Sequence, residues 1–354
     1  MSFRNTWPVF ALAFLPAILN AQVKQNGVWT DPDDETIPTV FHVQGEYVGE
    51  VDGGSKVGAQ VIALNEEGAV QAVVYPGGLP GAGWDETNRI LLDGVLADGK
   101  VEFTAAEGDR KYMDGKPQRF SATQQFPPEG HKVWTGTISE GVFRGQSEEG
   151  KAFVLKKTTR KSETLGAKPP EGAVVLFDGT DGERWEGGRV ADGILHTDAK
   201  DVRSKDKFKY YTIHLEFRTP FRPKARGQGR GNSGFYQTNG QEVQVLDSFG
   251  LEGLKNECGG LYGKATPRIN MCLPPLAWQT YDVELLPDPE AEEKDKNKSA
   301  LLTVRHNGVV IHDKVPTRPG GGTFKLQGHG NLLQYRNVWL VEPLEKAADP
   351  NETN

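Results

Sequence analysis

The sequence lacks the features that mark helical, membrane-embedded or nucleic-acid-binding proteins. Sustained 3.6-residue periodicity is nearly absent, and beyond the N-terminal segment no apolar run reaches the length of a membrane-spanning helix. Lysine and arginine total 41 against 48 aspartates and glutamates, a net charge of -7, so nucleic acid is not an expected partner. Abundant glycine and strand-forming segments rich in valine, threonine and aromatic residues instead predict an all-β chain.

The N-terminal segment is the one place with a targeting pattern. Arg4 precedes an apolar run over residues 7–19, and the small residue Ala21 follows it. This run is too short to span a membrane but is typical of a secretory signal peptide. We expect cleavage after Ala21, which removes residues 1–21 and leaves an exported protein, periplasmic or extracellular, with no transmembrane segment. An uncleaved anchor is the alternative.

A polar connector divides the rest of the chain in two. Residues 159–171 lose the apolar alternation and end with two prolines, so we expect a stiff linker there. Before it, residues 37–158 alternate short strands with tight turns, which predicts a small all-β domain, meander or barrel-like, whose role the sequence does not indicate. After it, residues 172–343 form a second β domain, and the tail 344–354 is predicted to be disordered.

Cysteine is scarce, with two in the chain, Cys258 and Cys272. Thirteen residues separate them, and in an exported protein such a pair predicts a disulfide rather than reactive thiols. The enclosed loop would then lie at a pocket rim and carry Tyr262 and Lys264 toward a substrate.

The most informative segment runs from residue 231 to 247 and predicts two strands around the turn Asn239-Gly240. Alternation sends Val243 and Val245 into a core and leaves Glu242 and Gln244 on the other face. Asp247 has the wrong parity to join them, so we predict a β-bulge that re-aims its side chain.

Two other strands show the same division between an apolar and a functional face. Residues 213–218 place Glu216 and Arg218, with a histidine, opposite three apolar residues, and residues 324–329 place Gln327 and His329, with a lysine, opposite two. A solvated outer face would explain any one strand alone. The recurrence of glutamine, histidine, asparagine and arginine favours a binding face.

Five sequence blocks of the second domain resemble one family. They are Leu-Phe-Asp-Gly-Thr at 176–180, Asn-Ser-Gly-Phe-Tyr at 232–236, Glu-Val-Gln-Val-Leu-Asp at 242–247, Trp-Gln-Thr-Tyr-Asp-Val at 278–283 and Leu-Gln-Gly-His-Gly at 326–330. In this order they resemble the 3-keto-disaccharide hydrolase domain family. The resemblance implies a concanavalin A-like β-sandwich, or jelly roll, with a concave face that acts on 3-keto-glycosides. It does not cover the first domain.

One of these blocks also resembles the Glu-x-Asp-x-x-Glu pattern of glucanases with this fold, whose outer glutamates are nucleophile and acid/base. Here Glu242, Gln244 and Asp247 occupy the three positions. Gln244 cannot titrate and Asp247 is one methylene shorter than glutamate, so the carboxyl separation of about 5 Å that double displacement needs is in doubt. A conventional glycoside hydrolase therefore becomes the alternative, and a carbohydrate-binding protein without catalysis is a third.

A 3-keto sugar needs less from the protein, since its ketone acidifies the C2 hydrogen. One base can start a β-elimination that expels the C1 substituent, with or without later addition of water. We take Glu242 or His329 as the base, with Asp247 or Glu216 positioning its partner, so the candidate catalytic residues are Glu242, His329 and Asp247. The sequence requires no cofactor, although a divalent metal on His329, Glu242 and Asp247 is left open. The expected substrate is a small carbohydrate or glycoside, and the candidate substrate-binding residues are Asn232, Gln244, Glu216, Arg218, Gln327, Arg336, Tyr262 and Lys264.

Overall fold

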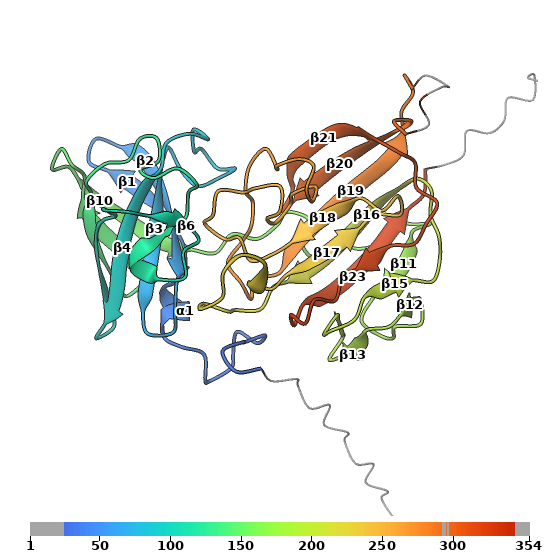
Figure 1. Ribbon diagram of the computed structural model, residues 1–354, viewed down its shortest axis with the longest axis horizontal. Coiled ribbons are helices and arrows are strands. Elements are labelled where there is room, and N and C mark those ends of the chain that lie inside the picture. The colour runs from blue at the N-terminus through green and yellow to red at the C-terminus, as the bar shows by residue number, and fades with distance from the viewer. Residues whose placement is uncertain (1–24, 292–294, 296, 344–354) are drawn as a thin grey trace, which may run out of the picture.

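The computed structural model describes residues 25–291, 295 and 297–343, and its strands form two β domains that lie side by side (Figure 1). Within these residues the helices are α1 (Val40–Val43) and two 3-10 turns, η1 (Pro117–Arg119) and η2 (Gly227–Gly229), so the all-β class is confirmed. No helix in the described part is long and apolar enough to cross a membrane. The predicted signal peptide and tail lie outside the described residues.

The first domain is a closed antiparallel barrel. Its strand order is β1-β10-β9-β8-β5-β4-β3-β2, so closure leaves no free edge. Alternate residues such as Tyr47, Phe103 and Phe153 fill the interior. The strands are β1 (Gly45–Val51), β2 (Ser55–Ala63), β3 (Ala69–Pro76), β4 (Ile90–Ala97), β5 (Lys100–Ala105), β8 (Thr135–Ser139), β9 (Val142–Gln146) and β10 (Ala152–Thr158).

The second domain is a sandwich of two antiparallel sheets. The larger has the order β13-β14-β23-β16-β19-β20-β21, with β11 also paired to β23, and the smaller has the order β12-β15-β22-β17-β18. The strands are β11 (Val174–Phe177), β12 (Trp185–Glu186), β13 (Arg189–Ala191), β14 (Ile194–His196), β15 (Val202–Ser204), β16 (Tyr211–Arg218), β17 (Ser233–Tyr236), β18 (Glu242–Val245), β19 (Gln279–Pro287), β20 (Ala300–His306), β21 (Val309–Thr317), β22 (Lys325–Leu326) and β23 (Gln334–Val341).

The apolar faces of the two sheets meet in one core. Leu215 and Phe217 of β16 belong to the same buried cluster as Val243 and Val245 of β18, together with Leu326 of β22. The alternation read from the sequence therefore describes these strands correctly. It follows that each sheet turns a polar face outward, and that the two polar faces lie on opposite sides of the sandwich.

The core of the sandwich continues into the barrel. Ile62 and Tyr75, on the outer side of the barrel, are part of the cluster that includes Phe249 and Met271 of the second domain. Trp84 also belongs to it: its ring lies 5.1 Å from that of Tyr75 and its Nε1 donates to a backbone carbonyl. Trp84 thus packs inward, as part of the core shared by the two domains.

Candidate functional site

The candidate site lies on the outer face of the smaller sheet. Glu242 and Gln244 both point outward from β18, and the β17–β18 register is unbroken, with Gly234 opposite Gln244 and Tyr236 opposite Glu242. A Cβ atom on Gly234 would come within 2.0 Å of Glu242 Oε1. A side chain at residue 234 would therefore displace the Glu242 carboxyl, which lies across the face at this point.

Glu242 is a largely buried carboxyl with few partners. Its residue is 7% exposed, and burial raises its pKa above the usual range, while the hydrogen bond from Tyr236 and the nearby charges of Lys325 and His329 oppose that rise. Within the described residues Glu242 forms no salt bridge. A carboxyl in this situation is a better proton acceptor than a free one.

Tyr236 and Lys325 flank the carboxyl. Burial, followed by the neighbouring Glu242, raises the pKa of Tyr236, so its hydroxyl stays protonated and donates to the carboxylate. Lys325 Nζ lies 3.5 Å from the centroid of the Tyr236 ring and 3.5 Å from Asp201 Oδ2. Gln327 Nε2 is 3.4 Å from the Tyr236 hydroxyl, which places one predicted substrate-binding residue on this face.

Buried amides lie behind the carboxyl. Gln244 Nε2 is 2.8 Å from Gln228 Oε1 and 3.3 Å from Asn232 Oδ1, and it also approaches the carbonyl oxygen of Asn256 at 3.3 Å. Gln244 is fully buried and Asn232 nearly so. The structure thus brings these two predicted residues together, in contact with each other and next to Glu242.

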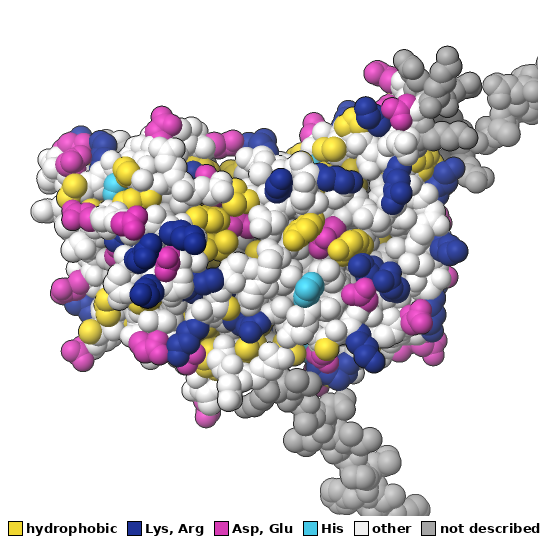
Figure 2. All heavy atoms as spheres, viewed as in Figure 1, with side chains coloured by type: hydrophobic (Ala, Val, Ile, Leu, Met, Phe, Trp, Pro, Cys, Tyr) yellow, Lys and Arg dark blue, Asp and Glu magenta, His cyan; other side chains and the backbone are white. Residues whose placement is uncertain are grey.

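The rim of the site comes from the segment after β18. Tyr262 N donates to Glu242 O at 3.1 Å, and the Tyr262 side chain is 44% exposed beside Tyr236 and Glu242. His329 is exposed near the carboxyl. Lys264 lies further along, where it lines a cavity of about 280 Å³ with Asn239 and Arg318, among others. Figure 2 shows this side of the sandwich, with acidic atoms between yellow side chains and a histidine nearby.

The prediction for Asp247 is wrong. Strand β18 ends at Val245 without a bulge, and Asp247 is fully buried, with Oδ2 2.6 Å from Arg230 Nη2. Its odd parity carries the side chain inward, where a buried guanidinium pairs with it. Asp247 therefore cannot join Glu242 and His329 around a metal, and the described residues contain no cluster of three His, Cys, Asp or Glu suited to one.

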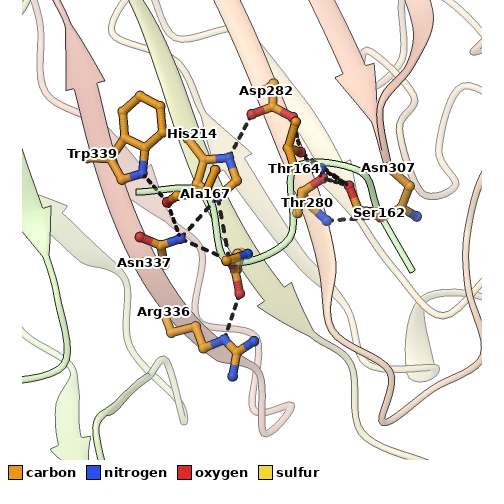
Figure 3. A network of polar contacts seen from close by, with 12 residues as sticks. Ser162, Thr164, Ala167, His214, Thr280, Asp282, Asn307, Arg336, Asn337 and Trp339 are labelled. Carbon is orange, nitrogen blue, oxygen red and sulfur yellow. Dashed lines mark hydrogen bonds and ion pairs between the residues drawn. The ribbon is translucent and has the colours of Figure 1, made fainter. Parts of the chain in front are cut away.

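The predictions for Glu216, Arg218 and Arg336 are also wrong, because these residues lie on the opposite face. Glu216 accepts from Arg336 Nε at 2.6 Å, on the outer side of the larger sheet, and the linker covers this pair (Figure 3). Gly166 N of the linker donates to Glu216 at 2.6 Å. Arg218 also projects from this side, donates to Gln334 at 2.6 Å and lies over Trp278.

The predicted disulfide is absent. Cys258 and Cys272 are both free and buried. Cys258 Sγ lies 3.2 Å from the hydroxyl of Tyr281, and Cys272 Sγ is 3.4 Å from the carbonyl oxygen of Leu273. These thiols are part of the sandwich interior, so the rim carrying Tyr262 is held by backbone pairing to β18 instead of a covalent staple.

Sequence reasoning missed Tyr236 as a site residue. In the hairpin Tyr236 is the cross-strand partner of Glu242, a position that could have been counted outward from the turn at Asn239-Gly240. Asp201 was missed as well, and it carried no signal, because its contact with Lys325 joins β22 to the segment before β15.

The family of the sandwich follows from a comparison with known domains. Residues 172–341 match the family model of the 3-keto-alpha-glucoside-1,2-lyase-like domain. The second domain is thus of a carbohydrate-processing class. More particularly, residues 172–341 form a 3-keto-alpha-glucoside-1,2-lyase-like domain, which confirms the resemblance read from its five sequence blocks. No curated protein matches the chain.

Several solved structures are similar over about half of the chain. A candidate glycosyl hydrolase from Parabacteroides distasonis ATCC 8503 is 28% identical with a TM-score of 0.43, covering 49% of this chain and 85% of that one. A second from the same organism is 20% identical with a TM-score of 0.37, covering 49% and 94%. A β-1,3-1,4-glucanase (lichenase) from a mouse hindgut metagenome is 13% identical with a TM-score of 0.25, covering 50% and 91%.

Proposed function

We propose that the protein cleaves the glycosidic bond of 3-keto-glycosides by abstraction of the C2 proton and β-elimination, with Glu242 as the base. The observation that carries the proposal is the state of Glu242: a largely buried carboxyl with a raised pKa, free of salt bridges within the described residues and open to one sheet face. The family of residues 172–341 supports the same substrate class.

The elimination needs three groups. The Glu242 carboxylate takes the C2 proton, and the C–H electron pair forms an enolate whose negative charge rests on the C3 oxygen. The enolate then collapses, a C1–C2 double bond forms, and the C1–O electron pair leaves with the aglycone, whose oxygen takes up a proton. Lys325 supplies positive charge for the enolate and His329, at the open side, is the proton donor for the leaving oxygen. Water can then add to the double bond.

A conventional glycoside hydrolase remains the alternative, and the carboxyl arrangement disfavours it. Double displacement uses two carboxyls about 5 Å apart, one of them a free nucleophile. Asp247 is withdrawn into its pair with Arg230. Asp201, the other carboxyl near this face, lies 3.0 Å from Arg203 and 3.5 Å from Lys325. Glu242 is left as the available base, which one-base elimination requires.

Export is part of the proposal as well. The apolar run at 7–19 after Arg4 supports it. Cell fractionation of the full-length protein tests it, and recovery of uncleaved protein in the cytosol would contradict it.

The experiment compares a glucoside with its 3-keto derivative in D2O. We expect cleavage of the 3-keto compound alone, with loss of the C2 hydrogen to the solvent and deuterium at C2 of the product that forms when water adds to the double bond. Glu242→Gln should lower turnover by about a thousandfold, within the range for loss of a general base. Glu186→Gln, an exposed glutamate at the far edge of the same sheet, is the matched control and should retain activity. Full turnover by Glu242→Gln, or equal cleavage of both glycosides, would show that the mechanism is wrong.

A further inference from the structure

A segment of the first domain leaves the barrel and reaches the second. Residues 111–121 contain β6 (Lys111–Tyr112), η1 and β7 (Phe120–Ser121). Strands β6 and β7 pair with each other in parallel, outside the closed barrel. We call this segment the clasp. Arg110 connects the two ends of the clasp to the barrel. The Arg110 side chain pairs with Asp93 of β4 and donates to the carbonyl oxygens of Glu107 at 2.7 Å and Phe120 at 3.3 Å.

The first arm of the clasp is Tyr112. Its hydroxyl donates to the carboxyl of Glu257, a fully buried residue of the sandwich domain. Glu257 Oε2 in turn accepts hydrogen bonds from the backbone amides of Gly253 at 2.8 Å and Leu254 at 2.9 Å, so the carboxyl holds the loop of residues 253–257 together. Burial raises the pKa of Glu257, and the Tyr112 hydrogen bond opposes that rise. The hydroxyl thus stabilises a charge that this position otherwise disfavours.

The loop closed by Glu257 touches the sugar site. The carbonyl oxygen of Asn256, the preceding residue, accepts from Gln228 Nε2 at 2.9 Å and from Gln244 Nε2 at 3.3 Å. Beyond Glu257 the chain pairs with β18: Gly259 N donates to Gln244 O at 3.0 Å, and Tyr262 follows at the rim.

The second arm runs in the opposite direction, from the sandwich into the barrel. Arg226 Nε donates to the carbonyl oxygen of Asp114 in the clasp at 3.1 Å, and Nη2 donates to that of Leu64 at 2.7 Å. Its guanidinium lies 5.2 Å from the centroid of the Phe120 ring. Arg226 immediately precedes η2, which contains Gln228. The contacts of Arg226 with the barrel domain therefore help to position Gln228, whose side-chain oxygen accepts from Gln244.

Both arms therefore end on Gln244, two residues from Glu242 on the same face of β18. We propose that the barrel domain completes the sugar site through its clasp, and that Tyr112 is a positioning residue for substrate binding. The kinetic part of this inference rests on the proposed function. The structural part does not, because it concerns the order of residues 253–262 alone.

The test removes one hydroxyl from the full-length protein. Tyr112→Phe keeps the ring but leaves the buried Glu257 carboxyl without its phenol donor. We expect KM for a 3-keto-glucoside to rise about tenfold, the size expected for one hydrogen bond to a charged group, with kcat nearly unchanged. Amide hydrogen exchange within residues 253–262 should become faster. Adding Glu257→Gln, which removes the unsupported charge, should restore part of the slow exchange.

Arg268→Gln is the matched control, because Arg268 pairs with Glu86 across the same domain interface but at its exposed surface. It should change neither KM nor exchange in residues 253–262. A Tyr112→Phe variant that melts earlier but keeps wild-type KM and wild-type exchange in this segment would overturn the inference. If the wild-type protein cleaves no 3-keto-glucoside, the proposed function fails, while faster exchange in Tyr112→Phe would still support the structural part, that the clasp orders residues 253–262.

Discussion

The two outer faces of the sandwich each carry a buried glutamate on a strand, and the pKa values of these two glutamates shift in opposite directions. On the larger sheet burial opposes the ionisation of Glu216, but hydrogen bonds from His214, Asn337, the Gly166 amide and Arg336 outweigh it and lower its pKa to about 2. On the smaller sheet burial dominates, and the pKa of Glu242 is raised. Burial alone therefore does not decide the direction of the pKa shift. The number of donors does.

The cause of the difference is what covers each face. The linker packs along the larger sheet, where Ser162 Oγ lies 2.6 Å from Thr280 Oγ1 and Gly166 donates to Glu216 (Figure 3). Its carbonyl at Ala167 accepts from Asn337 at 3.0 Å. This cover supplies donors and closes the surface. The linker does not cover the face of Glu242, so its carboxyl has few hydrogen-bond donors and stays accessible from that face. A carboxylate with many hydrogen-bond donors, such as Glu216, is stabilised as an anion and serves the structure. A carboxylate with few donors, such as Glu242, accepts a proton more readily and can act as a base.

The largest expected contrast is in stability. Glu216→Gln removes the buried charge that accepts from Arg336, Asn337 and the Gly166 amide, so we expect unfolding to become easier by about 2 to 3 kcal/mol, with activity per folded molecule kept. Glu242→Gln should cost no stability at neutral pH, because it removes an unfavourably buried charge. Urea unfolding followed by tryptophan fluorescence measures both. Glu284→Gln, on the same face as Glu216 but half-exposed with Arg305, should cost under about 1 kcal/mol. Equal losses for Glu216→Gln and Glu242→Gln would contradict the contrast.

The pH dependence of these two variants should have opposite signs. The folded pKa of Glu216 lies near 2, below its ordinary value of 4.5, so its contribution to stability is present above about 4.5 and is lost as pH falls toward 2. The raised pKa of Glu242 costs stability where the unfolded chain is ionised, and this cost disappears as the pH falls. The stability gap between wild type and Glu216→Gln should thus stay constant down to about pH 4.5 and shrink as the pH falls toward 2. If the stability differences from wild type changed with pH in the same direction for both variants, this prediction would be contradicted.

A smaller effect is expected from the loss of the Tyr236 hydroxyl, which donates a hydrogen bond to Glu242. Tyr236→Phe removes this donor, so the pKa of Glu242 should rise further and the acid limb of the kcat/KM profile should move to higher pH, with about a tenfold loss at neutral pH. Steady-state rates on a 3-keto-glucoside over a pH series measure it. Tyr210→Phe, a half-buried tyrosine away from Glu242, serves as the control. An unmoved acid limb would show that Tyr236 does not support the base.

Alternation in the sequence correctly separates core from surface but cannot say which surface. Glu216 on β16 and Glu242 on β18 show the same parity, and both avoid the core. A sandwich has two outer faces, and the assignment of each strand to a sheet depends on pairings such as β16 with β23, more than a hundred residues apart. The cover by the linker is equally non-local. Placing Glu216 and Arg336 beside Glu242 was therefore an error of topology and not of local pattern.

Spacing motifs failed where a distant partner decided the outcome. Asp247 has glucanase-like spacing from Glu242, but Arg230, seventeen residues before it, draws the side chain inside. Cys258 and Cys272 do become neighbours in the core, as their spacing permits, but both thiols are free and no disulfide joins them. Spacing along the chain fixes neither the direction of a side chain nor its neighbours. Tyr236 was different, since the hairpin alone places it opposite Glu242.

The smallest expected effect tests whether the two faces are independent. Thr164 Oγ1 donates to Asp282 Oδ2 at 2.7 Å and lies 3.0 Å from Thr280 Oγ1, so Thr164→Val should loosen the linker at a cost of about 1 kcal/mol. Amide exchange at Gly166 reports the loosening, and Thr159→Val, an exposed linker position, is the control. Because the sandwich core separates this network from Glu242, kcat and KM should stay unchanged. A change in kcat would mean that the covered face acts on the open one.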